Sequence, residues 1–345
     1  MARVLITGGA GFFGTVLKHR LLDEGFECYS IDLCPDPTSR DGLTTVVGDI
    51  ADEDGLGRIF SKGHFDAVFH CAALLSHEVK DKQALWRSNV EGTRVLADAV
   101  RTQRVPKVVF ISSNCLWGEG LHRPVTEDDE PNPAEIYGKS KWEGEKILLG
   151  HREDFDTTVF RSPTIISPGR LGLLSILFDF IRENRKVWMV GGGRNVYQFI
   201  YGPDLAEACV LAYKTDCRGI FNVGSDHVRP LRDVYEYVID KAGSRSRVCS
   251  LPKRPTLAAM ALCSALRISP LGTYQRRMIA EDFVFDTTKI KQDLGWRPTM
   301  TNEEMLYLAY EHYHANFEEI GRRTDVSAHN RRAKMGVLSL LKWLS

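Results

Sequence analysis

Tyr137 and Lys141 are the residues of this chain whose types and spacing most directly suggest catalysis. They stand four positions apart, so on a helix they lie on one face. A tyrosine with an unperturbed pKa of about 10 is a poor base at neutral pH, but a neighbouring ammonium favours the phenolate. Such a pair can take a proton from a substrate hydroxyl while a hydride leaves the same carbon. The plain alternative is a surface tyrosine beside a surface lysine.

A glycine-rich turn near the start of the chain, Gly8-Gly9-Ala10-Gly11-Phe12-Phe13-Gly14, predicts a place for a diphosphate. It joins an apolar, strand-like run at 4–6 to a helical pattern at 15–22. Glycines let a ligand approach the backbone, and a helix N-terminus offers free N–H groups and a positive dipole end. Asp32 closes the next predicted strand, about 20 residues on, where a carboxylate that binds ribose is expected. An ordinary turn residue would also explain Asp32.

These residues need a scaffold that brings them together. Strand-like and helical segments alternate through the first half of the chain, which predicts a parallel sheet covered by helices on both faces. The predicted strands are 4–7, 27–33, 44–48, 67–72, 107–112 and 157–161. Residues 83–101 and 133–149 have helical patterns, and Asn132-Pro133-Ala134-Glu135 has the form of a helix start. The predicted fold class is α/β, a Rossmann-type doubly wound parallel sheet with a smaller, mixed C-terminal substrate lobe.

The second half of the chain alternates less regularly. Its helical patterns are 171–183, 231–242 and 302–323, and 221–224 looks like a short strand. We expect three parts: a Rossmann domain of residues 1–165 plus roughly 195–225, a substrate lobe of roughly 165–200 and 225–315, and a basic amphipathic tail, 316–345. That tail either makes peripheral contact with a membrane or docks on the protein's own surface or on a partner subunit.

Composition excludes several classes of function. Lys+Arg and Asp+Glu are both 45, so no basic field points to nucleic acid. The eight cysteines form no CxxC pair, which favours reduced thiols and a cytoplasmic protein. The chain opens directly on a strand, so no secretory signal is expected, and no apolar run is long enough to span a membrane. No cluster has metal-site spacing, and we expect His70 to be a packed core histidine.

The motifs together resemble those of the extended short-chain dehydrogenase/reductases of the NAD-dependent epimerase/dehydratase type, over roughly residues 1–315. The matching stretches are TGGAGFFG at 7–14, GDI at 48–50, HCAA at 70–73, NVEGT at 89–93, SSNCLWG at 112–118, YGKSK at 137–141, DLA at 204–206, FNVG at 221–224 and LGW at 294–296. The resemblance implies that Tyr137 is the base, Lys141 its activator, and Ser113 the residue that hydrogen-bonds the reacting hydroxyl.

The resemblance also implies NAD as the cofactor rather than NADP, because a carboxylate at Asp32 would repel a 2′-phosphate. The residues implied at the cofactor are Gly8, Gly11, Phe12, Phe13, Gly14, Asp32, Asp49, Ile50, Ala72, Ala73, Asn89, Tyr137, Lys141 and Pro163. Simpler roles stay open for two residues: Ser113 could only cap a strand end, and Asn89 could only brace its helix.

Departures from the family pattern narrow the implied reaction. Sugar-nucleotide dehydratases carry an Asp-Glu pair where this chain has Asn114 and Cys115, so elimination of water is not expected. Cys115 stays open as a proton donor in a less common elimination, or as a buried, inert thiol. Epimerases typically carry asparagine and arginine, which hold the substrate diphosphate, where Thr164 and Tyr197 stand. The candidate substrate-binding residues are Cys115, Thr164, Tyr197 and Arg276.

The expected function is that of an NAD-dependent epimerase acting on a nucleoside-diphosphate sugar, through transient oxidation, a keto intermediate and return of the hydride. One alternative is a 3β-hydroxysteroid dehydrogenase-like oxidoreductase of lipophilic alcohols. The apolar stretch 255–266 is similar to a region that flanks the lipophilic substrate in such enzymes. Packing inside the second lobe explains that stretch equally well. Others are a sugar-nucleotide dehydratase/reductase and a protein that binds NAD without turnover. Family analogy also implies a homodimer built on 83–101 and 133–149.

Overall fold

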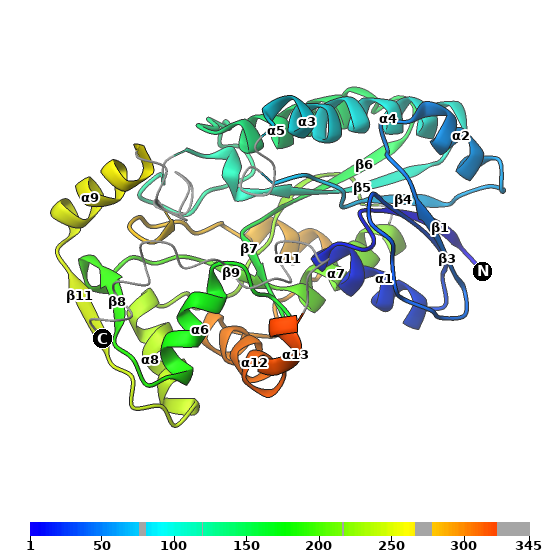
Figure 1. Cartoon of the computed structure of the whole chain (residues 1–345). Coiled ribbons are helices and arrows are strands. Elements are labelled where there is room, and N and C mark those ends of the chain that lie inside the picture. Colours follow the sequence, from blue (N-terminus) through cyan, green and yellow to red (C-terminus); the bar gives the residue numbers. More distant parts are fainter. Residues whose placement is uncertain (76–80, 119, 216, 266–277, 323–345) are drawn as a thin grey trace.

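The computed structural model describes residues 1–75, 81–118, 120–215, 217–265 and 278–322, and its centre is a seven-stranded parallel sheet (Figure 1). The strand order is β10-β6-β5-β4-β1-β2-β3. The strands are β1 (Arg3–Thr7), β2 (Glu27–Asp32), β3 (Leu43–Val47), β4 (Ala67–His70), β5 (Lys107–Ser113), β6 (Asp156–Ser162) and β10 (Gly219–Asn222). Consecutive strands run outward from β1 in both directions, so the order reverses there. The predicted Rossmann-type sheet is confirmed.

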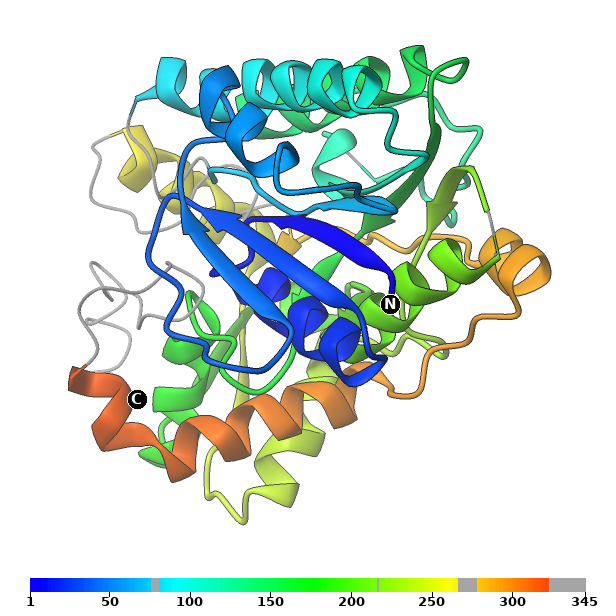
Figure 2. The same ribbon diagram turned by 90° about the vertical axis from the view of Figure 1, so that its right-hand side faces the viewer.

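Helices cover both faces of the sheet (Figures 1 and 2). On one face lie α1 (Phe12–Asp23) and α7 (Gly202–Lys214), and on the other α2 (Glu53–Phe60), α4 (Gly92–Thr102) and α5 (Ile136–Gly150). In β1, Val4 and Ile6 pack into the core beneath α1 and α7, whereas Leu5 packs into the core beneath α2, α4 and α5. Both faces of β1 are therefore buried, which explains its unbroken apolar run.

A smaller lobe packs below the sheet in Figure 1. It contains two pairs of short parallel strands, β7 with β9 and β8 with β11. Its elements are β7 (Thr164–Ile166), α6 (Leu174–Arg182), β8 (Val187–Val190), β9 (Phe199–Tyr201), α8 (Leu231–Lys241), β11 (Val248–Leu251), α9 (Lys253–Ala265), α12 (Asn302–Ala315) and α13 (Phe317–Arg322), while α11 (Thr288–Leu294) lies beside β10 and α7. No helix among the described residues is both long and apolar enough to cross a bilayer.

Three predicted helices differ from the structure. The helix expected from Pro133 begins at Ile136, because the backbone of Asn132 instead pairs with Trp117 and accepts a hydrogen bond from Gly118. The helix expected over 83–101 runs through α3 (Lys82–Trp86), a π-helical turn η1 (Arg87–Glu91) and α4. The helix expected over 302–323 divides at Asn316 into α12 and α13. Of the tail predicted over 316–345, residues 323–345 lie outside the described residues.

A buried ion pair that the sequence analysis did not predict joins α1 to the loop after β2. The side chains of Lys18 and Asp36 are 0% and 4% exposed, and their charged groups are in contact. The Lys18 ammonium also donates to the carbonyl oxygen of Gly9 at 3.2 Å, and Ser30 Oγ donates to Asp36 at 3.3 Å. Burial disfavours the charged form of Asp36. The hydrogen bonds from Lys18 and Thr38 outweigh this effect, so the pKa of Asp36 is lowered. The pair therefore fixes this loop behind the glycine turn.

Replacing Lys18 with methionine is expected to lower the free energy of unfolding by about 3–5 kcal/mol, because Asp36 would stay buried without its counter-charge. Urea unfolding of the full chain measures the loss. The double variant Lys18→Met/Asp36→Leu removes both charges and is expected to regain most of it. Equal losses in the single and double variants would contradict a role for the charge pair.

Candidate active site

The glycine-rich turn has the close backbone packing that a diphosphate cradle requires. Gly8 has a φ of +72°, and a Cβ there would lie 2.7 Å from the Cα of Ala72. A Cβ at Gly14 would lie 2.0 Å from the Gly8 carbonyl oxygen, and one at Gly11 would lie 3.0 Å from the same atom. The turn leads straight into α1 at Phe12, whose first turn holds no acidic residue. The positive end of the helix dipole therefore faces this turn, and the first turn of α1 supplies no carboxylate that would compete with a phosphate group.

The carboxylates expected near the adenosine end stand at the same edge of the sheet. Asp32, at the end of β2, accepts hydrogen bonds from the backbone N–H groups of Ala10 and Cys34, both at 3.0 Å. Asp49, just after β3, accepts from the N–H of Ala51 at 2.9 Å. The structure thus places Asp32 directly against the glycine turn and Asp49 at the end of the neighbouring strand. Ile50 is buried and lies next to Gly92 at the start of α4.

His70 is the centre of a buried hydrogen-bond chain at the end of β4. Its Nδ1 lies 2.7 Å from Thr7 Oγ1, and its Nε2 lies 2.9 Å from Thr93 Oγ1. Thr93 donates its own proton to the carbonyl oxygen of Asn89 at 2.7 Å. Because that hydroxyl proton is used, His70 must donate from Nε2 and accept at Nδ1. Thr7 Oγ1 also accepts from the N–H of Ala72 at 3.2 Å, so the chain fixes the strand end where Ala72 and Ala73 lie.

Burial, with a smaller contribution from the charge of Lys141, lowers the pKa of His70 to about 3. The ring is fully buried and stacks on Phe110 with centroids 5.1 Å apart. His70 is therefore a neutral, fully bonded core residue, as the sequence predicted.

Asn89 lies in the π-helical turn η1 and ties two other segments together. Its Oδ1 accepts from the N–H of Leu74 at 2.7 Å, and its Nδ2 donates to the Leu74 carbonyl and to Ser140 Oγ, each at 3.0 Å. Ser140 in turn donates to the carbonyl oxygen of Tyr137 at 2.8 Å. Asn89 thus braces both the loop after β4 and the first turn of α5. A π-turn redirects side chains within a helix and often marks a functional site.

Lys141 is almost completely buried beneath the end of the sheet. Its Nζ lies 4.0 Å from the centre of the Phe110 ring, a cation–π contact. Burial lowers its pKa to about 8, against the opposing influence of Cys71, Glu145 and Cys115. Tyr137, one turn earlier on the same helix, is half-buried.

Ser113 stands at the end of β5, opposite the start of α5. Its Oγ accepts from the N–H of Cys115 at 3.2 Å and so caps the short turn η2 (Asn114–Leu116). This bond uses one lone pair of the oxygen. A Cβ on Gly138 would lie 2.1 Å from the carbonyl oxygen of Cys115, so α5 packs directly on this turn. The turn that Ser113 caps is therefore in direct backbone contact with the helix that carries Tyr137 and Lys141.

The predicted substrate residues occupy different environments. Cys115 is half-buried, and Thr164 Oγ1 lies 3.8 Å from the sulfur of Met278. Tyr197 is 2% exposed, and its hydroxyl accepts from Asn114 Nδ2 at 2.6 Å. Pro163, expected at the cofactor, is buried between β6 and β7. Arg276 lies outside the described residues.

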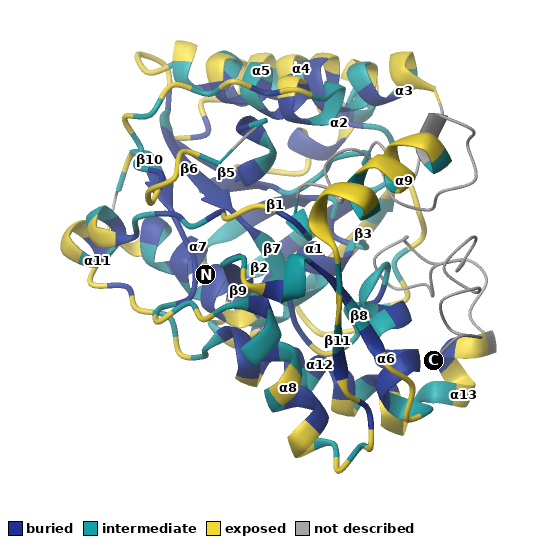
Figure 3. Cartoon of the chain, turned by 90° about the vertical axis from the view of Figure 1, so that its left-hand side faces the viewer, coloured by how far each residue is buried: buried dark blue, intermediate teal, exposed yellow. Residues whose placement is uncertain are grey.

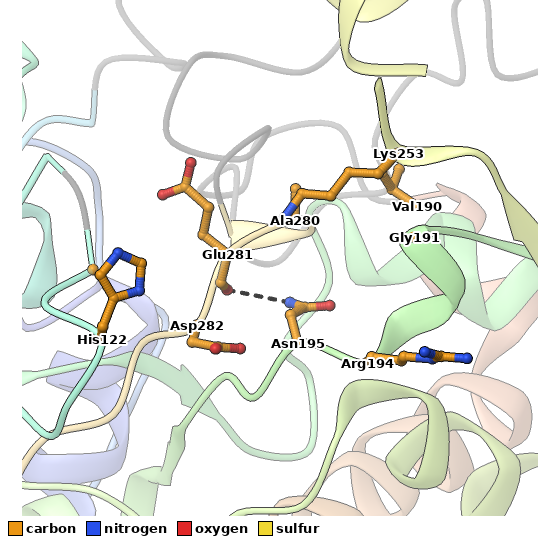
Figure 4. Close-up of a pocket in the computed structure, with 10 residues that line it drawn as sticks. His122, Val190, Gly191, Arg194, Asn195, Lys253, Ala280, Glu281 and Asp282 are labelled. Carbon is orange, nitrogen blue, oxygen red and sulfur yellow. Dashed lines mark hydrogen bonds between the residues drawn. The ribbon is translucent and has the colours of Figure 1, made fainter. Parts of the chain in front are cut away.

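A cleft of about 550 Å³ opens between the second lobe and the loop that follows η2 (Figure 4). It lies where β8 and β11 end, and the three glycines 191–193 that follow β8 all have positive φ. The lining residues are Gly120, His122, Val190, Gly191, Arg194, Asn195, Lys253, Ala280, Glu281 and Asp282. Figure 4 shows Lys253 reaching across toward Ala280, with His122 on the far side. In the sequence, only this run of three glycines could have pointed to the cleft.

Among the described residues, no group of three or more histidines, cysteines or carboxylates is arranged to hold a metal ion. The candidate site is also supported by polar residues to which the sequence analysis gave no individual role. They are Thr7, Lys18, Asp36, Thr93 and Ser140.

Gly138→Ala is expected to destabilise the protein by about 1–3 kcal/mol, because the new Cβ must push α5 away from Cys115. Gly150→Ala, at the other end of α5, is the matched control. A Cβ there meets nothing within 4 Å, so better helix propensity is expected to leave stability unchanged or slightly raised. Chemical denaturation of both variants measures the difference, and equal stabilities would refute the tight contact.

Comparison with known proteins agrees with this geometry. Residues 4–224 match the family described as NAD dependent epimerase/dehydratase. The uncharacterized protein y4nG of Sinorhizobium fredii is 35% identical over 341 residues, which cover 98% of this chain and 85% of that protein. The UDP-glucose 4-epimerase of Corynebacterium glutamicum is 26% identical, over 87% of this chain and 92% of the enzyme. A solved UDP-glucose 4-epimerase of Thermotoga maritima with UDP-glucose superposes with a TM-score of 0.75 at 24% identity, covering 91% of this chain and 99% of that one. The chain belongs to the NAD dependent epimerase/dehydratase family, and its enzymatic type is that of an NAD-dependent extended short-chain dehydrogenase/reductase.

Proposed function

We propose that this protein is an NAD-dependent sugar-nucleotide epimerase. The observation that carries the proposal is the backbone contact between the turn that follows Ser113 and the helix of Tyr137 and Lys141, at the sheet edge that also holds the glycine turn. The relatives named as UDP-glucose 4-epimerases support the reaction class. Asn114 supports it as well, because this buried amide bonds to Tyr197 and supplies no acid for eliminating water.

In this mechanism Tyr137 takes the proton of the sugar hydroxyl, and Ser113 holds that hydroxyl by a hydrogen bond. The ammonium of Lys141 stabilises the phenolate of Tyr137, and its burial strengthens that interaction. Bound NAD would supply reversible hydride transfer at that sugar carbon, so the sugar would pass through a ketone. We expect the glycine turn and Asp32 to hold the dinucleotide, and Ala72, Ala73 and Pro163 to lie beside it.

We expect the cleft between the second lobe and the loop after η2 to receive the nucleotide part of the substrate. It lies where the two parallel strands β8 and β11 end. Lys253 and Arg194 line it beside Glu281 and Asp282, and these two cations are the groups we expect to bind a diphosphate. The position of Tyr197, buried against Asn114, favours an indirect role for that residue.

A second candidate is an oxidoreductase that acts on lipophilic alcohols. Helix α9 carries the apolar sequence TLAAMALC at 256–263, and none of these residues is buried. Leu262 is 62% exposed, and Figure 3 shows the helix standing out from the body of the second lobe. Packing against the described residues of the lobe therefore does not account for this stretch. Since Lys253 at the start of α9 lines the cleft, a lipophilic substrate could enter beside this helix.

Incubation of the full chain with UDP-hexoses and UDP-pentoses tests the proposal, with product analysis by NMR. We expect interconversion of epimers without net NADH, and a higher melting temperature with UDP, because a ligand that binds only the folded state stabilises it. Tyr137→Phe is expected to lower turnover at least about 100-fold while NAD binding persists. Accumulation of NADH with a sterol, and no effect of UDP, would favour the second candidate.

The pKa of Lys141, about 8, predicts an alkaline limit to activity. As pH rises through 8 the ammonium loses its proton, so Tyr137 loses the charge that stabilises its phenolate. The pH dependence of kcat/KM reports the pKa values of essential groups in the free enzyme. We therefore expect kcat/KM to fall above about pH 8. A rate profile measured from pH 6 to 10 checks this, and a flat profile up to pH 10 would contradict the proposed role of Lys141.

Two further expectations accompany this proposal. We expect two chains to pair through α4 and α5, as the sequence resemblance implied. We expect the protein to work in the cytoplasm. Peripheral membrane contact through the tail concerns residues that lie largely outside the described ones.

A further inference from the structure

Arg170 brings a positive charge from the second lobe to the glycine turn of the first. It lies on the loop between β7 and α6, where its N–H donates to the carbonyl oxygen of Ser167 at 3.0 Å. Ser167 Oγ accepts from the N–H of Gly202, the first residue of α7, at 3.2 Å. The guanidinium carbon of Arg170 lies 5.4 Å from the centre of the Phe12 ring.

Phe12 marks the place where a dinucleotide diphosphate is expected. It is the first residue of α1 and directly follows Gly11. The N-terminus of this helix carries a positive partial charge, and its first turn holds no acidic residue. A guanidinium here adds a second positive group beside the first. Two positive groups at one place repel each other, and a diphosphate between them would be attracted to both.

The nearest ammonium of α1 does not serve this purpose. Lys18 lies behind the turn, where it bonds to the carbonyl oxygen of Gly9 and pairs with Asp36. The planar fork of an arginine, in contrast, can bond two phosphate oxygens at once.

We propose that Arg170 binds the diphosphate of the bound dinucleotide from the second lobe and thereby slows release of the cofactor. Both lobes then hold the dinucleotide, α1 through its N-terminal N–H groups and the second lobe through this guanidinium. The proposal rests on the NAD dependence of the family and not on the identity of the substrate, so it can fail or hold independently of the epimerase reaction.

Release of NADH from the preloaded full chain, chased with excess NAD and followed by NADH fluorescence, tests this role. Arg170→Met is expected to release NADH about tenfold faster than the unchanged protein. Arg170→Lys keeps the charge but loses the fork, so an intermediate rate is expected. The matched control is Arg182→Met, because the Arg182 guanidinium also stacks on a phenylalanine of the second lobe, 3.5 Å from the centre of the Phe317 ring.

The control is expected to release NADH at the unchanged rate. An unchanged rate in Arg170→Met would overturn the proposal and leave Arg170 as a stacking contact on Phe12. Equal acceleration in Arg170→Met and Arg182→Met would overturn it too, since loosening of the lobe would then explain both. A shallower dependence of release on salt in Arg170→Met alone would support it, because the lost contact is ionic.

Discussion

The close approach of β1, β4 and α1 at two glycines is the constraint on which the candidate site depends. A side chain at Gly14 would collide with the carbonyl of Gly8, and one at Gly8 would collide with the backbone of Ala72. These contacts set where α1 begins, and so where the positive end of its dipole lies. They also bring the end of β4 next to the same turn. The expected phosphate end and reacting end of the dinucleotide site are thus positioned by these two backbone contacts.

Polar side chains buried at this edge make the arrangement rigid. His70 links β1 to β4 and to α4 through two threonine hydroxyls, and each of its nitrogens has a partner. Asn89 links the loop after β4 to α5. Buried polar groups are costly when they lack partners, so small displacements of these elements are opposed. Lys141 lies in the same dry region, which explains why its pKa falls.

Local sequence patterns predicted the sheet and the glycine turn, because those features depend on neighbouring residues. A strand, a glycine run and an amphipathic helix each show within a dozen positions, and Asp32 follows at a regular distance. The pairing of Lys18 with Asp36, the pairing of Asn132 with Trp117, and the contact of Arg170 with Phe12 depend on how distant segments pack. The helix start at Asn132 was mispredicted for this reason: its local capping signal was sound, but a tertiary pairing overrode it.

The second lobe is joined to the candidate catalytic turn through the hydrogen bond from Asn114 to Tyr197. It joins the turn that follows Ser113 to the strand region before β9, across 83 positions of sequence, at 2.6 Å. Tyr197 is fixed in turn by packing against Phe199 and Phe283. A ligand that shifts the second lobe would therefore also shift the turn that Ser113 caps. Tyr197 stands at the position where the family resemblance implies an arginine for the substrate diphosphate, and here that position instead makes an internal contact with the turn that Ser113 caps.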